Sequence, residues 1–410
     1  MHALHTQSSF TTELASAVNS AGLRAMIQLA ERDVGLAART FECDIGLVKR
    51  LLLLGEMPGV IEGLGRVEVP LFDIRIPSTS LSVAKAMCLQ DLVMNGCGRE
   101  DVLVVALNSV VVAAAIRASS TDACAVLGLN LPIETARQLR SLRPEGVTGL
   151  VWNALAPFIS PKFGLPFLEQ VLRQNQLVDV GIVTLLASCL GSEKETAPLQ
   201  WRDLDSKAVG KERVQIGHVD VKKVSQCERI IALGGGKKAA ESLLGSFVLT
   251  AIARQILKNH QSSIAVDGVW ASKWSRTGLS RMSAGALALL ITRLGRAGIG
   301  VADATICAFQ YYYHAMAPII PSEAIVGFRD LTVNIAMPLS NRRAVLSYSD
   351  DFSAIYLVAE TRRGDCLVGT KEPHQWLRRH AFIATPQRVK ARRVPADGGT
   401  KGKKRECALA

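Results

Sequence analysis

The sequence predicts a mainly helical protein with two small all-helical modules, a mostly helical third domain with a small β-hairpin, and a basic tail. Of the 410 residues, 49% are hydrophobic and 20% are charged, which excludes a largely disordered chain and is enough for two or three cores. Aromatic residues make up only 5%, so the cores must be aliphatic and rich in alanine, which favours packed helices. From about residue 14 to 120, apolar residues recur mainly at helical spacing.

The first helices are expected at the start of this region. Asn19 or Ser20 could cap a helix over residues 23–30, and Asp44 precedes a second helix whose leucines and valine lie at residues 47–54. Apolar and polar residues alternate over residues 67–76, with Pro70 and Pro77 marking the limits, and this pattern predicts an extended segment.

A longer apolar segment at residues 102–116 could be mistaken for a membrane span. It is about 15 residues long, where a span needs roughly 18–20, and Asn108 and Ser109 interrupt it. We therefore expect a buried core helix and no membrane partner.

A similar sequence occurs twice, at residues 37–72 and 122–158, about 88 residues apart. Each copy reads as a short helix, a Gly/Pro turn, another apolar helix and an extended end that contains Pro and Phe. The matching positions are Leu51 with Leu139, Leu54 with Leu142, Leu64 with Leu150, and Pro70-Leu71-Phe72 with Pro157-Phe158. The pattern favours a duplication over two unrelated helical hairpins with coincident leucines. It predicts one module at residues 1–80 and a second at 81–165.

This repeated sequence resembles the FlhD family of flagellar transcriptional activators, in which an ALxLGL-type turn precedes a helix with paired leucines. The turn AVLGL at residues 125–129 carries the resemblance together with Leu139, Leu142, Val147 and Leu150. The similarity covers roughly 24–76 and 110–163, and the first copy departs from it at residues 43–45. The resemblance implies helical modules that support DNA binding by a regulator, that work in an oligomer, and that in several members need a second, zinc-containing subunit.

Residues 166–360 have a different pattern and form the third predicted domain. An apolar helix is expected at 180–190, and helical periodicity returns at 239–257 and 283–297. Between them, residues 214–223 and 228–236 form two alternating segments joined by a short polar turn, which predicts a β-hairpin.

Several of these segments resemble the catalytic domain of tyrosine recombinases, the phage integrases, over some 180 residues. The residues that match the family's "TGLRxxE…LxWxDID" box are Glu195, Leu199, Trp201, Asp203 and Asp205. The hairpin would present Lys222, Lys223 and Arg229 to DNA, as the family's minor-groove hairpin does. The segment LSYSDDFSAIY at residues 346–356 resembles the box that carries the nucleophile, which would be Tyr356.

The catalytic chemistry needs residues that this sequence lacks. Cleavage of a phosphodiester by a tyrosine requires two arginines to neutralise the extra negative charge of the transition state. Ser192 occupies the position of the first arginine, and residues 304–325, where the second should fall, contain none. Cys307 and Gln310 are the nearest stand-ins for that second box, and Tyr348 replaces a His or Trp. We expect a scaffold without catalytic competence; an active recombinase for DNA integration and excision that uses Tyr356 is the alternative.

Two further segments, one rich in glycine and one containing tryptophans, carry lysines or arginines. LGGGKK at residues 233–238 departs from a phosphate-binding loop at Ile231 and Lys238, so a flexible strand end before a helix is expected. Lys273 and Arg276 lie beside Trp270 and Trp274 and could contact a DNA backbone, or could belong to an ordinary surface loop.

The nine cysteines are irregularly spaced and include no CxxC pair. This spacing predicts neither a disulfide framework nor a metal site. No secretory signal is visible at the N-terminus. We expect a cytoplasmic protein that needs no cofactor.

The positive charge is concentrated at the C-terminus. Residues 361–410 hold 13 Lys or Arg against four Asp or Glu, a net +9 that leaves +3 of the chain's +12 for the rest. This tail, with Arg392 and Arg393, is predicted to be a disordered arm able to hold any polyanion. The sequence thus predicts a DNA-binding regulatory or accessory protein of a mobile or integrative element, acting in transcription. Double-stranded DNA is its expected partner, and a homo-oligomer or a second regulator subunit are further candidates.

Overall fold

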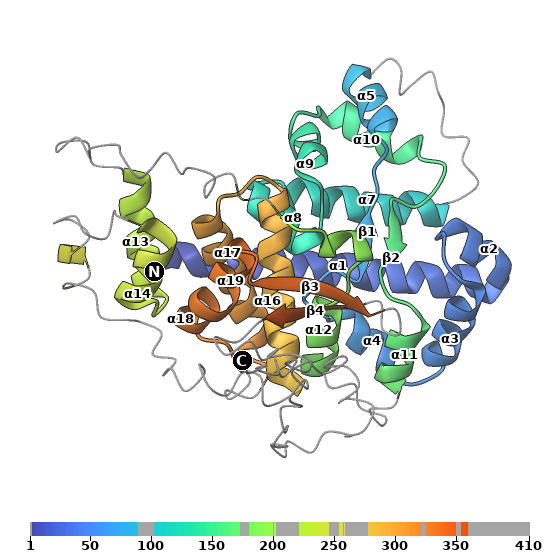
Figure 1. Cartoon of the computed structure of the whole chain (residues 1–410). Helices are drawn as coiled ribbons and strands as arrows, with labels where there is room; N and C mark the ends of the chain where they lie inside the picture. Colours follow the sequence, from blue (N-terminus) through green and yellow to red (C-terminus); the bar gives the residue numbers. More distant parts are fainter. Residues whose placement is uncertain are drawn as a thin grey trace, which may run out of the picture.

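The computed structural model describes residues 2–88, 102–172, 180–199, 201, 221–245, 254–256, 258, 278–320, 325–349 and 354–359. These residues form a mainly helical fold with two small antiparallel sheets of two strands each (Figure 1). The predicted fold class is therefore confirmed. In the described part, no helix combines the length and the apolar character needed to cross a lipid bilayer.

The N-terminal half contains two successive sets of elements. The first set is α1 (His2–Arg32), α2 (Val34–Thr40), α3 (Ile45–Gly55), α4 (Val60–Gly65), β1 (Phe72–Ile74) and α5 (Ser78–Ala86). The second set is α7 (Val102–Ala118), α8 (Asp122–Leu129), α9 (Ile133–Arg140), α10 (Pro144–Trp152), β2 (Ile159–Pro161) and α11 (Leu165–Leu172). The core helix expected near residues 102–116 is confirmed as α7, which buries Leu107, Val111 and Val112.

One of the two predicted helix starts is confirmed. The side chain of Asp44 accepts hydrogen bonds from the backbone N–H groups of Gly46 and Leu47, and so caps α3. The predicted cap at Asn19 or Ser20 is wrong, because α1 continues through both residues to Arg32.

Asn19 instead holds the segment that leads into β1. Its Nδ2 donates to the carbonyl oxygens of Val67 and Val69, each at 2.9 Å, and its Oδ1 accepts from the N–H of Leu71 at 2.9 Å. Asn19 is fully buried. We call this set of hydrogen bonds the first asparagine clamp.

Asn108 of α7 makes a second asparagine clamp in the same place of the second set. Its Nδ2 donates to the carbonyl oxygen of Ala156 at 3.1 Å, and its Oδ1 accepts from the N–H of Phe158 at 2.8 Å. Ala156 and Phe158 lie 87 residues after Val69 and Leu71, the partners of the first clamp. The same long-range contact at the same spacing supports the duplication that the sequence indicated.

The two sets are related by an approximate twofold axis at the sheet between them. Strand β1 pairs with β2 in antiparallel fashion, and Asp73 lies opposite Ser160 at the centre. On either side, the N–H of Arg75 donates to Phe158 O at 2.7 Å, and the N–H of Lys162 donates to Leu71 O at 2.9 Å. The contacts around the sheet therefore repeat in the two sets about 87 residues apart.

The C-terminal half begins with α12 (Val180–Ser188) and the short helix η1 (Glu193–Thr196). Further elements of this half are α13 (Val221–Ala232), α14 (Gly236–Leu244), α16 (Gly278–Arg296), α17 (Val301–Met316), α18 (Phe328–Leu331), η5 (Thr332–Ala336), α19 (Met337–Ser340), β3 (Ala344–Ser349) and β4 (Ala354–Ala359). The helices expected at 180–190 and 283–297 are confirmed as α12 and α16. The hairpin of β3 and β4 packs on α16, where Gly285 lets the strand backbone approach closely.

The hairpin expected at residues 214–236 is wrong where the structure describes it. Residues 221–232 are helical, because Gln226, Cys227, Ile230 and Ile231 are buried together at the spacing of one helix face. Residues 214–220 lie outside the described part. The chain does contain a small hairpin in its C-terminal half, but it lies more than 100 residues later, at β3 and β4.

One hydrophobic core runs through both halves. Helices α16 and α17 pack against α1 and α8, and the Tyr311 hydroxyl donates to the backbone oxygen of Glu68 at 3.0 Å. The predicted module boundary near residue 165 is therefore bridged by packing.

Candidate nucleic-acid interface

Helices α13 and α14 lie at one end of the molecule, and α2 and α3 lie at the other (Figure 1). The inner face of α14 buries Ala239, Ala240, Leu243 and Leu244. α13 packs on α17, and α14 packs on α18 and η5. The outer faces of the pair are left exposed.

Three residues join the two helices in a tight turn. The N–H of Gly234 donates to Ile231 O and the N–H of Gly235 donates to Ile230 O, both at 2.9 Å, which is the paired hydrogen bonding of a Schellman helix end. Gly234 has φ of 83°, in the left-handed region that favours glycine. A short turn that contains glycine joins the two helices of αα-hairpins and of helix-turn-helix modules.

The first turn of α14 presents lysines on the surface. Lys237 and Lys238 are exposed, and Lys237 forms an ion pair with Glu241 one turn later, at 3.5 Å. A helix N-terminus attracts anions through its free N–H groups, and nearby lysine side chains strengthen that attraction. In helix-turn-helix proteins, the start of the second helix is the part that meets DNA.

The start of α13 carries two of the predicted DNA-contact residues. Lys222 is 72% exposed, and its Nζ lies 3.2 Å from Asp303 at the start of α17. Lys223 is partly buried beside it. The sequence placed these lysines on a hairpin, and the structure places them on a helix of the same exposed pair.

Arg229, the third predicted contact from this segment, turns toward the interior. Its guanidinium Nη2 donates to Gln310 Oε1 at 2.9 Å and lies 3.9 Å from the Cys307 sulfur. Burial raises the pKa of Cys307, although the guanidinium opposes this. Cys307 and Gln310, which the sequence predicted as the nearest stand-ins for a recombinase His and Arg, therefore hold Arg229 in place, and Arg229 does not share the exposed face of the lysines.

The box around Glu195 holds the C-terminal half together. Glu195 forms a two-pronged ion pair with Arg293 of α16, at 2.6 Å and 3.2 Å, and Arg293 also donates to Leu190 O. Burial alone would raise the pKa of Glu195, but the guanidinium outweighs burial and holds it at about 2, against an ordinary 4.5. Ser192, in place of the first catalytic arginine, caps η1 together with Glu195.

Leu199 and Trp201 of the same box pack over Gly295 of α16. A Cβ atom at Gly295 would lie 2.5 Å from the Trp201 ring and closer still to Leu199. Trp201 is buried. These box residues dock the segment onto α16, while Asp203 and Asp205 lie outside the described residues.

Tyr356, the predicted nucleophile of the alternative function, lies in strand β4. It sits directly opposite Ser347 of β3, whose hydroxyl donates to the Tyr356 oxygen at 3.0 Å. Tyr348, expected in place of a catalytic His or Trp, is opposite Ile355 in the same hairpin. The structure therefore places Tyr356 on a strand with a serine as its hydrogen-bond partner.

Four predicted contact residues lie outside the described part of the chain: Lys273, Arg276, Arg392 and Arg393. Lys237 and Lys238 are the residues that the sequence reasoning missed. The signal was present, because a glycine run followed by Ala239, Ala240 and Leu243 at helical spacing is typical of a helix end and a new helix. Comparison of the chain with models of protein families, with curated proteins and with solved structures gives no match.

Proposed function

We propose that this chain is a DNA-binding regulatory or accessory protein that contacts duplex DNA through the helix pair α13–α14 and does not cut it. The observation that carries the proposal is the glycine turn that ends α13 and starts α14 with exposed Lys237 and Lys238. Phosphate contacts of this kind give affinity and position a protein on the duplex. Lys222, near the start of α13, is a further exposed lysine of the helix pair.

The wider setting of this function follows from the resemblances in the sequence. We expect a regulator of transcription on a mobile or integrative element, with FlhD-like modules in the N-terminal half and a recombinase-like scaffold in the C-terminal half. The basic tail would add affinity without sequence preference. A cytoplasmic location is supported by the six cysteines that the structure describes, all of which are free thiols.

The geometry around Tyr356 supports a role without cleavage. Arg229 is committed to Gln310, and Arg293 is committed to Glu195. Neither guanidinium is shown beside the tyrosine hydroxyl, whose partner is Ser347. Phosphodiester cleavage would need such charges around the scissile phosphate.

The test is binding of the full chain to a fluorescent duplex of arbitrary sequence, followed by anisotropy across a range of salt concentrations. The double variant Lys237→Gln/Lys238→Gln should lower the slope of log K against log salt by about 2, since each lost phosphate contact removes about one unit. Lys49→Gln/Lys85→Gln is the matched control, because both lysines are exposed in the N-terminal half and the charge change is the same. The control should keep the wild-type slope.

The same measurement without residues 386–410 separates the helix pair from the tail. Deletion should flatten much of the salt dependence and spare any sequence preference, and the lysine variant should still lower the remaining slope. No binding at low salt would refute DNA binding altogether. A lysine variant indistinguishable from the control would move the interface away from α14.

Cleavage is tested on a nicked suicide substrate. We expect no covalent protein–DNA adduct with the wild-type chain. An adduct that Tyr356→Phe abolishes would overturn the accessory role and establish the active recombinase instead.

A further inference from the structure

The approximate twofold axis through the β1–β2 sheet creates two equivalent faces, and the chain treats them differently. On one face, Asn130 Nδ2 donates to Asp73 Oδ1 at 2.9 Å. Lys162 lies close enough to Asp73 and Glu195 for their charges to act on it; burial lowers its pKa to about 8, and both carboxylates oppose that shift. Tyr311 of α17 covers the same face by donating to Glu68 O. This is the covered face.

The equivalent residues of the other face do not make the equivalent contacts. Glu42 is the counterpart of Asn130, Ser160 of Asp73, and Arg75 of Lys162. Glu42 adopts the same left-handed backbone as Asn130, with φ of 52° and 51°. The Glu42 carboxylate forms an ion pair with Arg75 at 3.0 Å. Glu42 and Ser160 do not form the hydrogen bond that Asn130 and Asp73 form on the covered face.

Ser160 is left with an unsatisfied hydroxyl. The residue is only 5% exposed, and its Oγ has no hydrogen-bond partner among the described residues. A buried hydroxyl without a partner is unfavourable, and in native proteins it marks a place where another group belongs.

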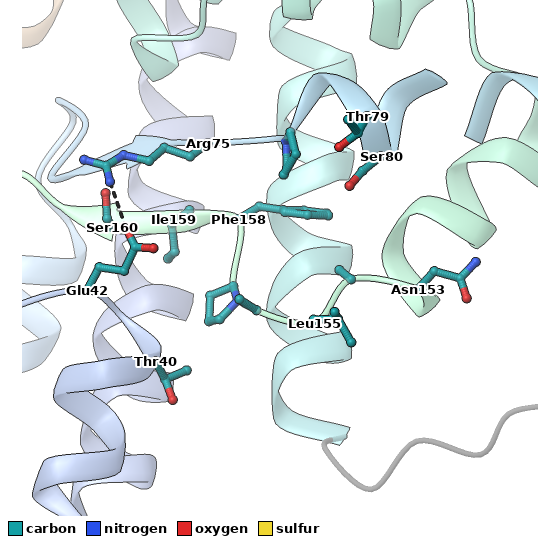
Figure 2. A pocket seen from close by; sticks show the side chains of 14 residues that line it. Thr40, Glu42, Arg75, Thr79, Ser80, Asn153, Leu155, Phe158, Ile159 and Ser160 are labelled. Carbon is teal, nitrogen blue, oxygen red and sulfur yellow. Dashed lines mark hydrogen bonds and ion pairs between the residues drawn. The ribbon is translucent and has the colours of Figure 1, made fainter. Parts of the chain in front are cut away.

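Ser160 lines a pocket of about 350 Å³ on this open face. Figure 2 shows Arg75, Glu42 and Ser160 at one end of the pocket, and Thr79, Ser80 and Asn153 toward the other. Exposed apolar surface beside them comes from Leu155, because the side chains of Phe158 and Ile159 are buried (Figure 2). A pocket of this volume, with apolar walls and a few converging polar groups, is of the size that holds small molecules.

We propose that this pocket binds a small aromatic carboxylate. The contacts of the two faces show which groups the geometry accepts: a carboxylate, that of Glu42, pairs with Arg75 on the open face, and a phenol, Tyr311, donates to the backbone of Glu68 on the covered face. Arg75 and Leu155 are the counterparts of Lys162 and Glu68 on the open face, and both line the pocket.

Each polar group of the ligand has a partner in this arrangement. The carboxylate binds the Arg75 guanidinium, whose present partner Glu42 is itself 71% exposed, so that their ion pair is easily opened. The Ser160 hydroxyl gains the hydrogen bond that it lacks. The ring lies against Leu155, whose exposed apolar side chain then loses contact with water.

The experiment is calorimetric titration of the full chain with 4-hydroxyphenylacetate, with 2-(4-hydroxyphenyl)ethanol as the comparator that lacks the carboxylate. We expect saturable binding of the acid and binding of the alcohol weaker by about tenfold or more, because charge-assisted hydrogen bonds to arginine are strong. Arg75→Gln should weaken binding of the acid by a similar factor. Ser160→Ala should weaken it by about fivefold, the value of one hydrogen bond of about 1 kcal/mol.

Arg24→Gln is the matched control, since Arg24 is exposed on α1 and does not line the pocket; it should bind as the wild type does. Absence of saturable binding up to the solubility limit of the acid would overturn the proposal. Equal binding of acid and alcohol would also overturn it, as would binding that neither Arg75→Gln nor Ser160→Ala changes. None of these outcomes depends on whether the chain binds DNA.

Discussion

Replacement of Asn19 by leucine tests the first asparagine clamp. Asn19→Leu keeps a side chain of similar size but removes the partners of three buried backbone groups, the carbonyl oxygens of Val67 and Val69 and the N–H of Leu71. A buried polar group left unpaired costs about 1–3 kcal/mol, so three groups predict a loss of about 3–9 kcal/mol in the free energy of unfolding. Such a loss is a large share of the stability of a typical protein.

The second clamp supplies an internal comparison. Asn108→Leu unpairs two backbone groups, those of Ala156 and Phe158, and predicts a loss of about 2–6 kcal/mol by the same reasoning. Asn153→Leu is the control, because Asn153 is exposed and should stay within about 0.5 kcal/mol of the wild type. The assay is urea unfolding followed by circular dichroism at pH 7. If the unfolding free energies of both clamp variants lie within about 1 kcal/mol of the control, the hydrogen bonds of the clamps do not stabilise the fold by the predicted amount.

Three further predictions follow from buried groups. Arg293→Met should cost about 3 kcal/mol at pH 7, because it leaves the Glu195 carboxylate buried and unpaired, and the loss should shrink toward pH 4 as that carboxylate takes up a proton. In the wild type, the pKa of Glu195 is about 2 against an ordinary 4.5, so the stabilisation is complete above pH 4.5 and disappears between pH 4.5 and 2. Urea unfolding across this pH range measures both effects. Gly295→Ala should destabilise by about 1–3 kcal/mol, because the new methyl group meets Trp201, and thermal unfolding measures the effect. Ser160→Ala should leave the unfolding free energy unchanged or raise it by up to about 1 kcal/mol, because it removes an unsatisfied buried hydroxyl; a clear loss in urea unfolding would show that the hydroxyl has a partner.

The helices that the sequence predicted well are those with strong local signals. Asp44 precedes a leucine-rich stretch at helical spacing, and both the cap and the helix α3 are present. The same kind of signal misled at Asn19, because asparagine favours caps but can also bond distant backbone. Its partners lie 48 to 52 residues away, and no local pattern reports such a contact.

The error at residues 228–236 has a different cause. A short apolar run such as Ile230-Ile231 followed by glycines is compatible with a strand end or with a helix end. Tertiary packing determines that this segment is helical, because it buries Cys227, Ile230 and Ile231 on one helix face. Lys237 and Lys238, the lysines of the candidate interface, follow the glycine run in the sequence, but their position at a helix start depends on that same packing.

Neither the family resemblances nor the residue pattern along the chain predicts the pocket on the open face. Ser160 and Asp73 are neighbours only across the sheet. That Glu42 makes no hydrogen bond to Ser160, where Asn130 bonds Asp73, is seen only when the two sets are compared in three dimensions. A pocket formed by such a mismatch leaves no motif along the chain.

Two similar sets of elements in one polypeptide can carry different residues at equivalent positions. In a symmetric dimer of identical subunits, any substitution appears on both faces at once, and a group that suits one side must be tolerated on the other. Here Lys162 and Arg75, or Asn130 and Glu42, hold the same place in the two sets and are different residues. The covalent link also removes any dependence of the pairing on protein concentration. One face can therefore be permanently committed to the rest of the chain while the other remains available to the surroundings.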